Sequence, residues 1–243
     1  MEFSISNLTV MGHKVHPKIH RTPLLYPWDS RWFARSEQLP VFLKQEIKIR
    51  EYLEHKLREA GIDGISIERT PKDISIMILA AKPGVVIGRS GQGLELIRKE
   101  IERQFLQHKL KVRLNIQAVL QPALSAAIVA TNAVAEIERR IPFRRVMKQA
   151  IQKVMAAGAQ GVKMCMSGRL NGAEIARTEK LAEGKMSLIT LRSKVDYAWA
   201  EAHTVYGKIG VKVWIYQGEF FGIQDKFEKK GETPADPKKP RRA

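Results

Sequence analysis

Basic side chains are concentrated between residues 139 and 153, a segment that contains no acidic residue. The basic positions are Arg139, Arg140, Arg144, Arg145, Lys148 and Lys153. Arg144, Arg145 and Lys148 are spaced three and four residues apart, so a helix would present them on one face. Guanidinium groups bind phosphates in a bidentate manner, and such a face therefore suits a polyanion. A solvated basic face without a partner would have the same spacing, so the segment alone leaves both interpretations open.

The tetrapeptide Gly88-Arg89-Ser90-Gly91 is a second candidate for phosphate binding. Because glycine has no Cβ, Gly88 and Gly91 would let the backbone approach a phosphate closely. A helix that begins after Gly91 would add unpaired N–H donors and partial positive charge at its N-terminus. Arg89 contributes a formal charge. Two glycines three residues apart also occur in ordinary helix–helix turns, so the flanking elements decide between the two interpretations.

Side chains suited to catalysis or metal binding form no cluster in the sequence. His13, His16 and His20 lie in one stretch, but no carboxylate or fourth ligand accompanies them. Asp196 and Glu201 would point to opposite faces of one strand, which does not suit an acid–base pair. The motif GxxxxGK[ST] is absent, which disfavours an ATP-driven helicase. We therefore expect no catalytic residue, no metal site and no cofactor.

The elements around the tetrapeptide follow from hydrophobic periodicity and from turn residues. We expect, in order, a helix over 46–60, strands over 64–69 and 73–80, a short apolar helix over 84–87, a helix over 92–105 and a strand over 112–119. This order places the tetrapeptide between two helices that rest on a sheet. It resembles a KH domain of the second type (α-β-β-α-α-β), whose GXXG loop clamps the backbone of about four nucleotides. The KH resemblance implies RNA contacts for Gly88, Arg89, Ser90 and Gly91.

The second half of the chain predicts another unit of helices and strands. We expect a helix from Pro122 to about 140, a basic helix after Pro142 to about 157, and strands over 162–167, 187–192, 195–206 and 211–216, with a loop over 169–184 and a turn over 207–210. Trp199 and Trp214 are interpreted as sheet packing rather than as base-stacking platforms, and Cys165 as a small core residue. The predicted fold class is α+β, a KH domain followed by two helices on a four-stranded antiparallel sheet.

The overall charge narrows the choice of partner. The chain has 243 residues with 42 Lys and Arg against 25 Asp and Glu, a net charge of +17. This charge indicates nucleic acid or an anionic membrane surface. Membrane binding would need bulky apolar anchors opposite a basic helical face, and around residues 139–153 such anchors are few. The apolar window over 123–135 is too short to span a bilayer. Nucleic acid is therefore the favoured partner, and no membrane contact is expected.

The domain organisation follows from composition along the chain. Residues 1–45 contain four prolines and are predicted to form an extended arm that a partner must pin. The KH domain is predicted over 46–120 and the second α+β domain over 121–222. Residues 223–243 are basic and proline-rich, which predicts a disordered tail. The single cysteine excludes a disulfide framework and indicates a reducing, intracellular setting.

Longer strings in the sequence carry a more specific resemblance. They are SGRLNGAEIARTE (Ser167–Glu179), AEAHTVYGKIGVKVWIYQGE (Ala200–Glu219), RRIPFRRVMKQA (Arg139–Ala150), MGHKVHP (Met11–Pro17) and DSRWFA (Asp29–Ala34). Over about residues 11–222 the chain resembles the bacterial-type small ribosomal subunit protein S-three family. The resemblance implies a non-enzymatic, cytoplasmic component of the ribosome. In the head of the small subunit it would bind small-subunit rRNA beside the tenth and fourteenth small-subunit proteins.

The same resemblance assigns roles to particular residues. Lys14 and Arg31 are expected to contact rRNA. Arg144, Arg145 and Lys148 are expected to line the channel through which mRNA enters, where the family assists the unwinding of structured messages. Two alternatives are a free RNA-binding or ribosome-assembly factor with the same KH unit, and a nuclease or lyase that acts on nucleic acid. A KH unit alone explains none of the C-terminal strings, and no Asp, Glu and His cluster has metal-binding spacing.

Overall fold

Alternating isoleucines build the first sheet of the protein, which we describe from a computed structural model. The structure describes residues 15–22, 24–106 and 110–220. Ile74, Ile76 and Ile78 lie on one face of β3 (Asp73–Ala80) and are almost completely buried. The neighbouring strands are β2 (Ile62–Arg69), antiparallel to β3, and β4 (Lys111–Ala118), parallel to it.

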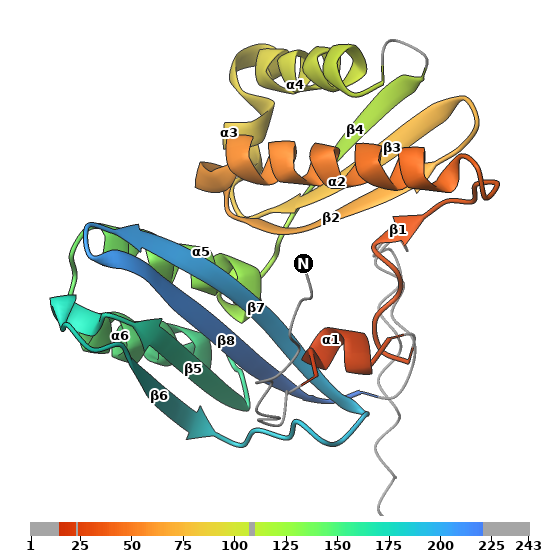
Figure 1. Cartoon of the computed structure of the whole chain (residues 1–243). Coiled ribbons are helices and arrows are strands. Elements are labelled where there is room, and N and C mark those ends of the chain that lie inside the picture. Colours follow the sequence, from red (N-terminus) through yellow and green to blue (C-terminus); the bar gives the residue numbers. More distant parts are fainter. Residues whose placement is uncertain (1–14, 23, 107–109, 221–243) are drawn as a thin grey trace, which may run out of the picture.

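Three helices share a hydrophobic core with that face of the sheet. They are α2 (Leu39–Lys56), α3 (Pro83–Ile87) and α4 (Gln92–Gln104), in the upper half of Figure 1. The order α-β-β-α-α-β confirms the predicted fold of the second KH type. The predicted start of the first helix at residue 46 is wrong. Helix α2 begins at Leu39 because Pro40 fits in its first turn, where the missing N–H costs no hydrogen bond.

The described part of the N-terminal arm, from residue 15 onward, contacts both domains of this chain and contains regular elements rather than extended chain throughout. It contains α1 (Pro17–His20) and β1 (Ser30–Arg31). Strand β1 pairs parallel with β2 and adds a fourth strand to the first sheet. Glu46 on α2 accepts hydrogen bonds from the side chains of Ser30 and Trp32, so this end of the arm is fixed to the KH domain.

The other end of the arm is fixed to the second domain through a buried arginine. The guanidinium of Arg21 has no solvent-exposed surface and donates hydrogen bonds to the carbonyl oxygens of Leu188 at 2.9 Å and Thr190 at 3.0 Å. The hydroxyl of Tyr26 donates to the carbonyl of Val195 at 2.9 Å. Burial raises the pKa of Tyr26, so this hydroxyl keeps its proton and remains a donor. The arm therefore connects the two domains.

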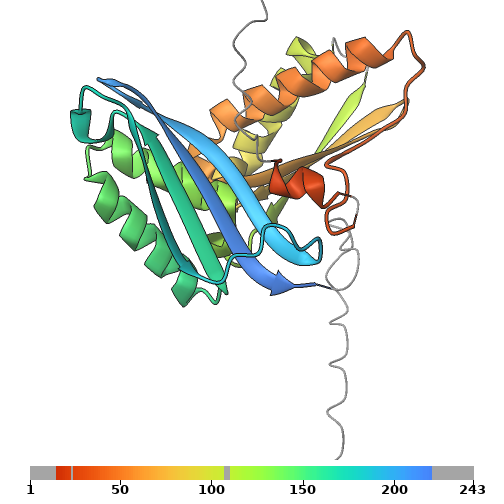
Figure 2. The same cartoon turned by 60° about the horizontal axis from the view of Figure 1, so that its bottom comes forward.

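The second domain is an antiparallel sheet with two helices on one face. The strands lie in the order β6 (Arg177–Gly184), β5 (Gly161–Gly168), β8 (Gly207–Glu219) and β7 (Ser193–Thr204). Helix α5 (Ala126–Glu138) lies over β7 and β8, and α6 (Phe143–Ala156) lies over β5 and β6. Figure 2 shows the sheet on the side away from the helices. The predicted fold class is confirmed.

Four predictions for the second domain are wrong. The predicted loop over 169–184 contains β6, an exposed edge strand whose polar residues give no apolar alternation. The predicted strand over 187–192 is a loop, held by Arg21 and by a hydrogen bond between the Ser187 and Thr190 hydroxyls. Strand β8 already begins within the predicted turn, at Gly207. Finally, Pro122 begins a short 3-10 turn, and α5 starts after Ser125, whose hydroxyl accepts the amide N–H of Ile128.

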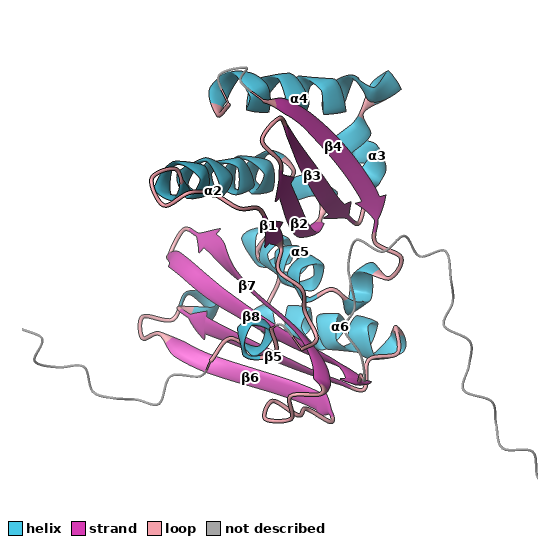
Figure 3. Cartoon of the chain, turned by 90° about the vertical axis from the view of Figure 1, so that its right-hand side faces the viewer, coloured by secondary structure: helices cyan, strands magenta, loops and turns pink. Residues whose placement is uncertain are grey.

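A cluster that we call the Asp196 junction joins the arm and both domains. It consists of Lys18, Asp63, Ser125, Ala126 and Asp196. The Asp196 carboxylate lies 2.7 Å from the Lys18 ammonium and accepts the amide N–H of Ala126 at 2.6 Å. The Ser125 hydroxyl donates to Asp63 of the KH domain at 2.5 Å. Figure 3 shows the result, with α5 lying between β2 of the first domain and the sheet of the second.

The charge of Lys18 is favoured in the Asp196 junction. Burial lowers the pKa of Lys18, but the attraction of Asp196 and the hydrogen bond to it outweigh burial and raise the pKa above its usual value. At the other end of α5, Glu138 accepts two hydrogen bonds from Arg58 of the KH domain, at 3.0 and 3.1 Å. Both ends of α5 are therefore linked to the KH domain.

Replacing the junction carboxylate tests this arrangement. We expect Asp196→Asn to lower the free energy of unfolding by about 2 kcal/mol, because it removes the charge that Lys18 and the N-terminus of α5 both face. Chemical denaturation measures the change. Glu201→Gln is the matched control: it lies on the same strand, where its exposed carboxylate pairs with Lys208 at 2.8 Å, and it should change the unfolding midpoint little.

The pH dependence of the same difference provides a second measurement. The folded state raises the pKa of Lys18, so its stabilisation is complete below the unfolded pKa of about 10.4 and is lost as the pH rises through the folded pKa. The difference in free energy of unfolding between wild type and Asp196→Asn should therefore be constant around neutral pH and become smaller above about pH 10. A gap that is absent at neutral pH would contradict the junction.

Candidate nucleic-acid interface

The GXXG tetrapeptide forms a tight turn between α3 and α4. Gly88 has φ 69° and ψ −171°, and Gly91 has φ 79° and ψ 1°, both in regions that favour glycine. A Cβ on Gly88 would lie 3.1 Å from the backbone nitrogen of Gly93, whereas a Cβ on Gly91 would meet nothing within 4 Å. Gly88 is therefore required by both its conformation and its surroundings. Gly91 is favoured by its conformation alone.

The turn leaves groups that can bind an anion open. Among the described residues, no side chain caps the N-terminus of α4. The amide N–H of Gln92, the first residue of α4, donates to the carbonyl of Arg89, so the amide N–H groups that follow it in the first turn are the candidates for binding an anion. Arg89 is exposed. Val85 and Leu96, on the helices that flank the turn, are 54% and 58% exposed. Our sequence reasoning missed both residues, although Leu96 lies off the apolar stripe of its helix and could have been recognised by that.

The basic residues of α6 lie on one exposed face, as the spacing predicts. Arg144, Arg145 and Lys148 are exposed, while Phe143 and Val146 on the opposite side of the helix belong to the hydrophobic core. The helix is therefore fixed by its buried side, and the orientation of the basic face is set by packing rather than by the basic residues themselves.

One of these cations, Arg144, is paired with an acidic residue on strand β6. The Arg144 guanidinium donates two hydrogen bonds to Glu179 on β6, at 3.1 and 3.0 Å. This contact raises the pKa of Arg144 and lowers the pKa of Glu179. Across the described ranges, no carboxylate lies within 4.0 Å of Arg145 or Lys148. Residues 139–153 contain no acidic residue, but Arg144 is still paired, because Glu179 comes from a distant part of the sequence.

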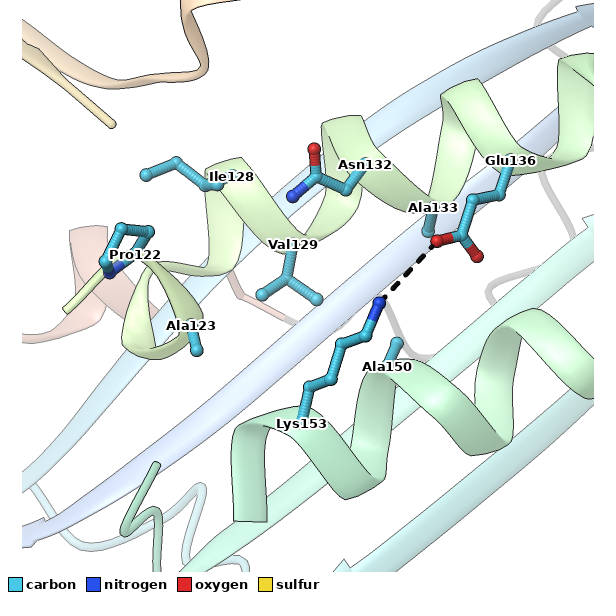
Figure 4. A pocket seen from close by; sticks show the side chains of 9 residues that line it. All are labelled: Pro122, Ala123, Ile128, Val129, Asn132, Ala133, Glu136, Ala150 and Lys153. Carbon is cyan, nitrogen blue, oxygen red and sulfur yellow. Dashed lines mark ion pairs between the residues drawn. The ribbon is translucent and has the colours of Figure 1, made fainter. Parts of the chain in front are cut away.

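Lys153 is also paired with a carboxylate outside its segment. The Lys153 ammonium lies 3.8 Å from the Glu136 carboxylate. This ion pair crosses a groove between α5 and α6 (Figure 4). The rest of the groove is mainly apolar and includes Ile128, Val129 and Ala150. Lys153 therefore bridges the two helices instead of extending the basic face formed by Arg145 and Lys148.

Other predicted residues are spread over the structure. Arg31 is half-buried in β1, the edge strand of the first sheet, whereas α6 belongs to the second domain. Lys14 and His13 lie outside the described residues. The His16 ring packs edge-on against Tyr197 with centroids 4.7 Å apart, which is a structural contact. Within residues 15–22, 24–106 and 110–220, no group of three His, Cys, Asp or Glu could hold a metal.

The aromatic residues divide into packed and exposed ones. Trp32 donates its ring N–H to Glu46 at 2.5 Å and lies against Phe42. Trp214 is half-buried beside Tyr197, as predicted for a sheet-packing residue. Trp199 is 57% exposed, which corrects its interpretation as sheet packing. Cys165 is buried, but it points to the face of the sheet away from the helices and is not part of the hydrophobic core, which corrects its interpretation as a core residue. In the described part of the chain, none of the helices combines the length and the apolar character needed to cross a bilayer.

A KH fold with an open GXXG turn, joined to a second domain that exposes a basic helix, defines the class of the molecule as a KH-domain protein. Comparison with known families agrees. Residues 48–124 match the family model "KH domain", and residues 134–215 match "Ribosomal protein S3, C-terminal domain".

Curated relatives extend the match over most of the chain. The small ribosomal subunit protein uS3 of Caldicellulosiruptor saccharolyticus is 48% identical over 209 residues, which cover 86% of this chain and 93% of the relative. The protein of the same name from Laribacter hongkongensis is 44% identical over 230 residues, which cover 95% of this chain and 94% of the relative. The chain therefore belongs to the family of small ribosomal subunit protein uS3, and it is a structural protein rather than an enzyme.

The conformation of the GXXG turn makes a direct prediction. We expect Gly88→Ala to lower the free energy of unfolding by about 2 kcal/mol, because alanine is strained at this φ and ψ and its Cβ would meet Gly93. Gly84→Ala is the matched control. Gly84 lies in α3, where an added Cβ would meet nothing within 4 Å, and alanine favours helix, so stability should stay constant or rise by less than about 1 kcal/mol. Equal effects of both changes in thermal denaturation would contradict the strained turn.

Proposed function

We propose that this chain is a structural component of the head of the small ribosomal subunit, where it binds small-subunit rRNA and lines the channel through which mRNA enters. The observation that carries the proposal is the exposed pair Arg145 and Lys148 on α6, whose opposite side is locked into the core. The family supplies the ribosomal setting. The tenth and fourteenth small-subunit proteins are the neighbours that we propose in the head.

The rRNA contacts that we propose come from the GXXG turn and the arm. Gly88, Arg89, Ser90 and Gly91 would hold a phosphate through backbone N–H groups at the start of α4 and through the Arg89 charge. Lys14 and Arg31 would contact rRNA from the arm. The arm is joined to both domains, so RNA that binds it would meet a surface of fixed orientation.

The role that we propose for α6 is to hold separated mRNA strands apart. Arg145 and Lys148 are three residues apart and reach phosphates from one helical face. Arg144 would contribute less, since Glu179 already neutralises part of its charge. Translocation would supply the unwinding energy, and the cationic face would lower the free energy of the separated strands by attracting their phosphates.

The α6 face is tested by translation of structured messages on purified mutant ribosomes. Arg145→Ala with Lys148→Ala should leave folding nearly unchanged, because exposed helical positions usually alter stability by no more than about 0.5 kcal/mol. The double variant should slow messages with stable downstream hairpins several-fold relative to unstructured messages. Arg144→Ala should have a smaller effect, because its partner is already Glu179.

Two outcomes would overturn the proposed role. Equal wild-type and mutant rates on both kinds of message would remove α6 from the mRNA path. Failure of the double variant to assemble into subunits would make Arg145 and Lys148 rRNA anchors instead. Lys72→Ala, in the turn between β2 and β3, is the control for loss of an exposed positive charge.

The GXXG turn is tested with the isolated chain and single-stranded RNA. Arg89→Asp should preserve the fold, because Arg89 is exposed, and should weaken binding by placing a negative charge beside the phosphate site. Each phosphate contact that is lost should lower the slope of log affinity against log salt by about 0.7. Lys72→Asp makes the same change in charge at the opposite end of the β3 strand. If both variants lose affinity equally, the turn is no phosphate clamp and only net charge matters.

A further inference from the structure

The second sheet has a face that the helices do not cover. On β5, Val162, Met164 and Met166 are buried under the helices, so Lys163 and Cys165 point to the other side. The strand register extends this side across the sheet. One cross-strand row contains Lys180, Cys165, Lys212 and Trp199. The next row contains Ala182, Lys163, Trp214 and Tyr197. We call the side chains of these two rows the outer sheet face.

Most aromatic rings of the outer sheet face already have partners. The Tyr197 ring contacts His16 of the arm on one side and Trp214 on the other, with ring centroids 4.7 and 5.2 Å apart. The ammonium of Lys163 lies 5.6 Å from the centre of the Trp214 ring. The arm therefore covers one end of this face. Among the described residues, Trp199 takes part in none of these ring or cation contacts, and it is 57% exposed.

The charge around Trp199 is positive and uncompensated. Lys212 lies directly opposite Trp199 on β8, and Lys180 is two strands further along the same row. Both lysines are exposed, and among the described residues neither lies within 4.0 Å of a carboxylate. Glu201, the neighbouring acid on β7, is paired with Lys208. The exposed ring and the two lysines thus share one row of about 14 Å across four strands, in which the buried Cys165 lies between Lys212 and Lys180.

We propose that the outer sheet face binds single-stranded RNA, with one base stacked on Trp199 and phosphates held by Lys212 and Lys180. Aromatic rings on an open antiparallel sheet stack bases regardless of sequence, and neighbouring cations attract the backbone. The charge decides between RNA and a protein partner. A protein seated here would have to compensate both lysines with acidic groups while covering the Trp199 ring, whereas RNA supplies a flat base and phosphates together. The site lies on the side of the sheet away from α6 and deepens the proposed rRNA binding, on which it rests.

Binding is measured with the full chain in a background that weakens the GXXG turn and the α6 face, while the arm stays unchanged in every variant. Arg89→Asp, Arg145→Ala and Lys148→Ala form this background, and the probe is a single-stranded RNA of twelve mixed nucleotides. Trp199→Ala should weaken the remaining binding roughly fivefold to a hundredfold, and Trp199→Phe should restore most of it. Lys212→Gln and Lys180→Gln should each lower the salt slope by about 0.7. Tyr206→Ala, which removes another exposed aromatic ring at the turn after β7, is the matched control and should bind as the background does.

Photochemical cross-linking adds a readout of position. RNA with 5-bromouridine at every uridine should cross-link to the peptide that contains Trp199, and mass spectrometry identifies the residue. Unchanged affinity and salt slope in the Trp199 and Lys212 variants, with cross-links elsewhere, would overturn the proposal and leave this face to a protein partner. This result would not affect the translation assay for α6, so failure here is distinguishable from failure of the proposed function.

Discussion

The carboxylate of Asp196 holds together three segments that are far apart in sequence. It pairs with Lys18 of the arm, accepts the first amide N–H of α5, and lies beside Ser125, which donates to Asp63 of the KH domain. A carboxylate at a helix N-terminus is stabilised by the partial positive charge there as well as by the ammonium. Without this group, the Lys18 ammonium would face the partial positive charge at the N-terminus of α5. Together with the packing of α5 on β7 and β8 and the Arg58–Glu138 contact, this interaction fixes α5 between the two domains.

The buried Arg21 completes the attachment of the arm. Its guanidinium is bonded to backbone carbonyls between β6 and β7, so it shapes a loop that has no strand partner of its own. At the same time, Ser30 and Trp32 bind Glu46 in the KH domain. The described part of the arm therefore works as a connector, because its polar groups bind both domains.

Because the arm and both domains are connected, the basic surfaces have fixed positions on the molecule. The helices of the second domain expose Arg145 and Lys148 on one side, and its sheet exposes Trp199, Lys180 and Lys212 on the other. The net charge of +17 explains attraction to RNA in general, but it does not distinguish positions. Ion pairs do distinguish positions. Glu179 pairs with Arg144 and Glu136 pairs with Lys153, so fewer cations remain for a phosphate backbone than the sequence suggests.

Sequence reasoning succeeded where periodicity and glycine chemistry act locally. The order of helices and strands that hydrophobic periodicity predicts, together with the two glycines of the GXXG turn, is sufficient to predict the KH domain. It failed where tertiary contacts decide. Strand β6 is an exposed edge strand with polar residues, so its sequence shows no apolar alternation. Because this strand was not predicted, the pairing of its Glu179 with Arg144 could not be predicted either. The exposure of Trp199 likewise depends on which part of the sheet the arm covers. The arm contacts this face through His16 and Tyr197, which are about 180 positions apart in the chain.

The central claim is that the α6 face lies along the mRNA path, and a tethered probe tests it most directly. Cys165 is the only cysteine and is buried, so Lys148→Cys provides a single reactive thiol on α6. An iron chelate attached to that thiol would generate hydroxyl radicals in assembled small subunits that carry a bound message. The account predicts cleavage of the mRNA downstream of the decoding site, in the stretch that is about to enter. Cleavage confined to rRNA, with the message intact over its whole length, would contradict it.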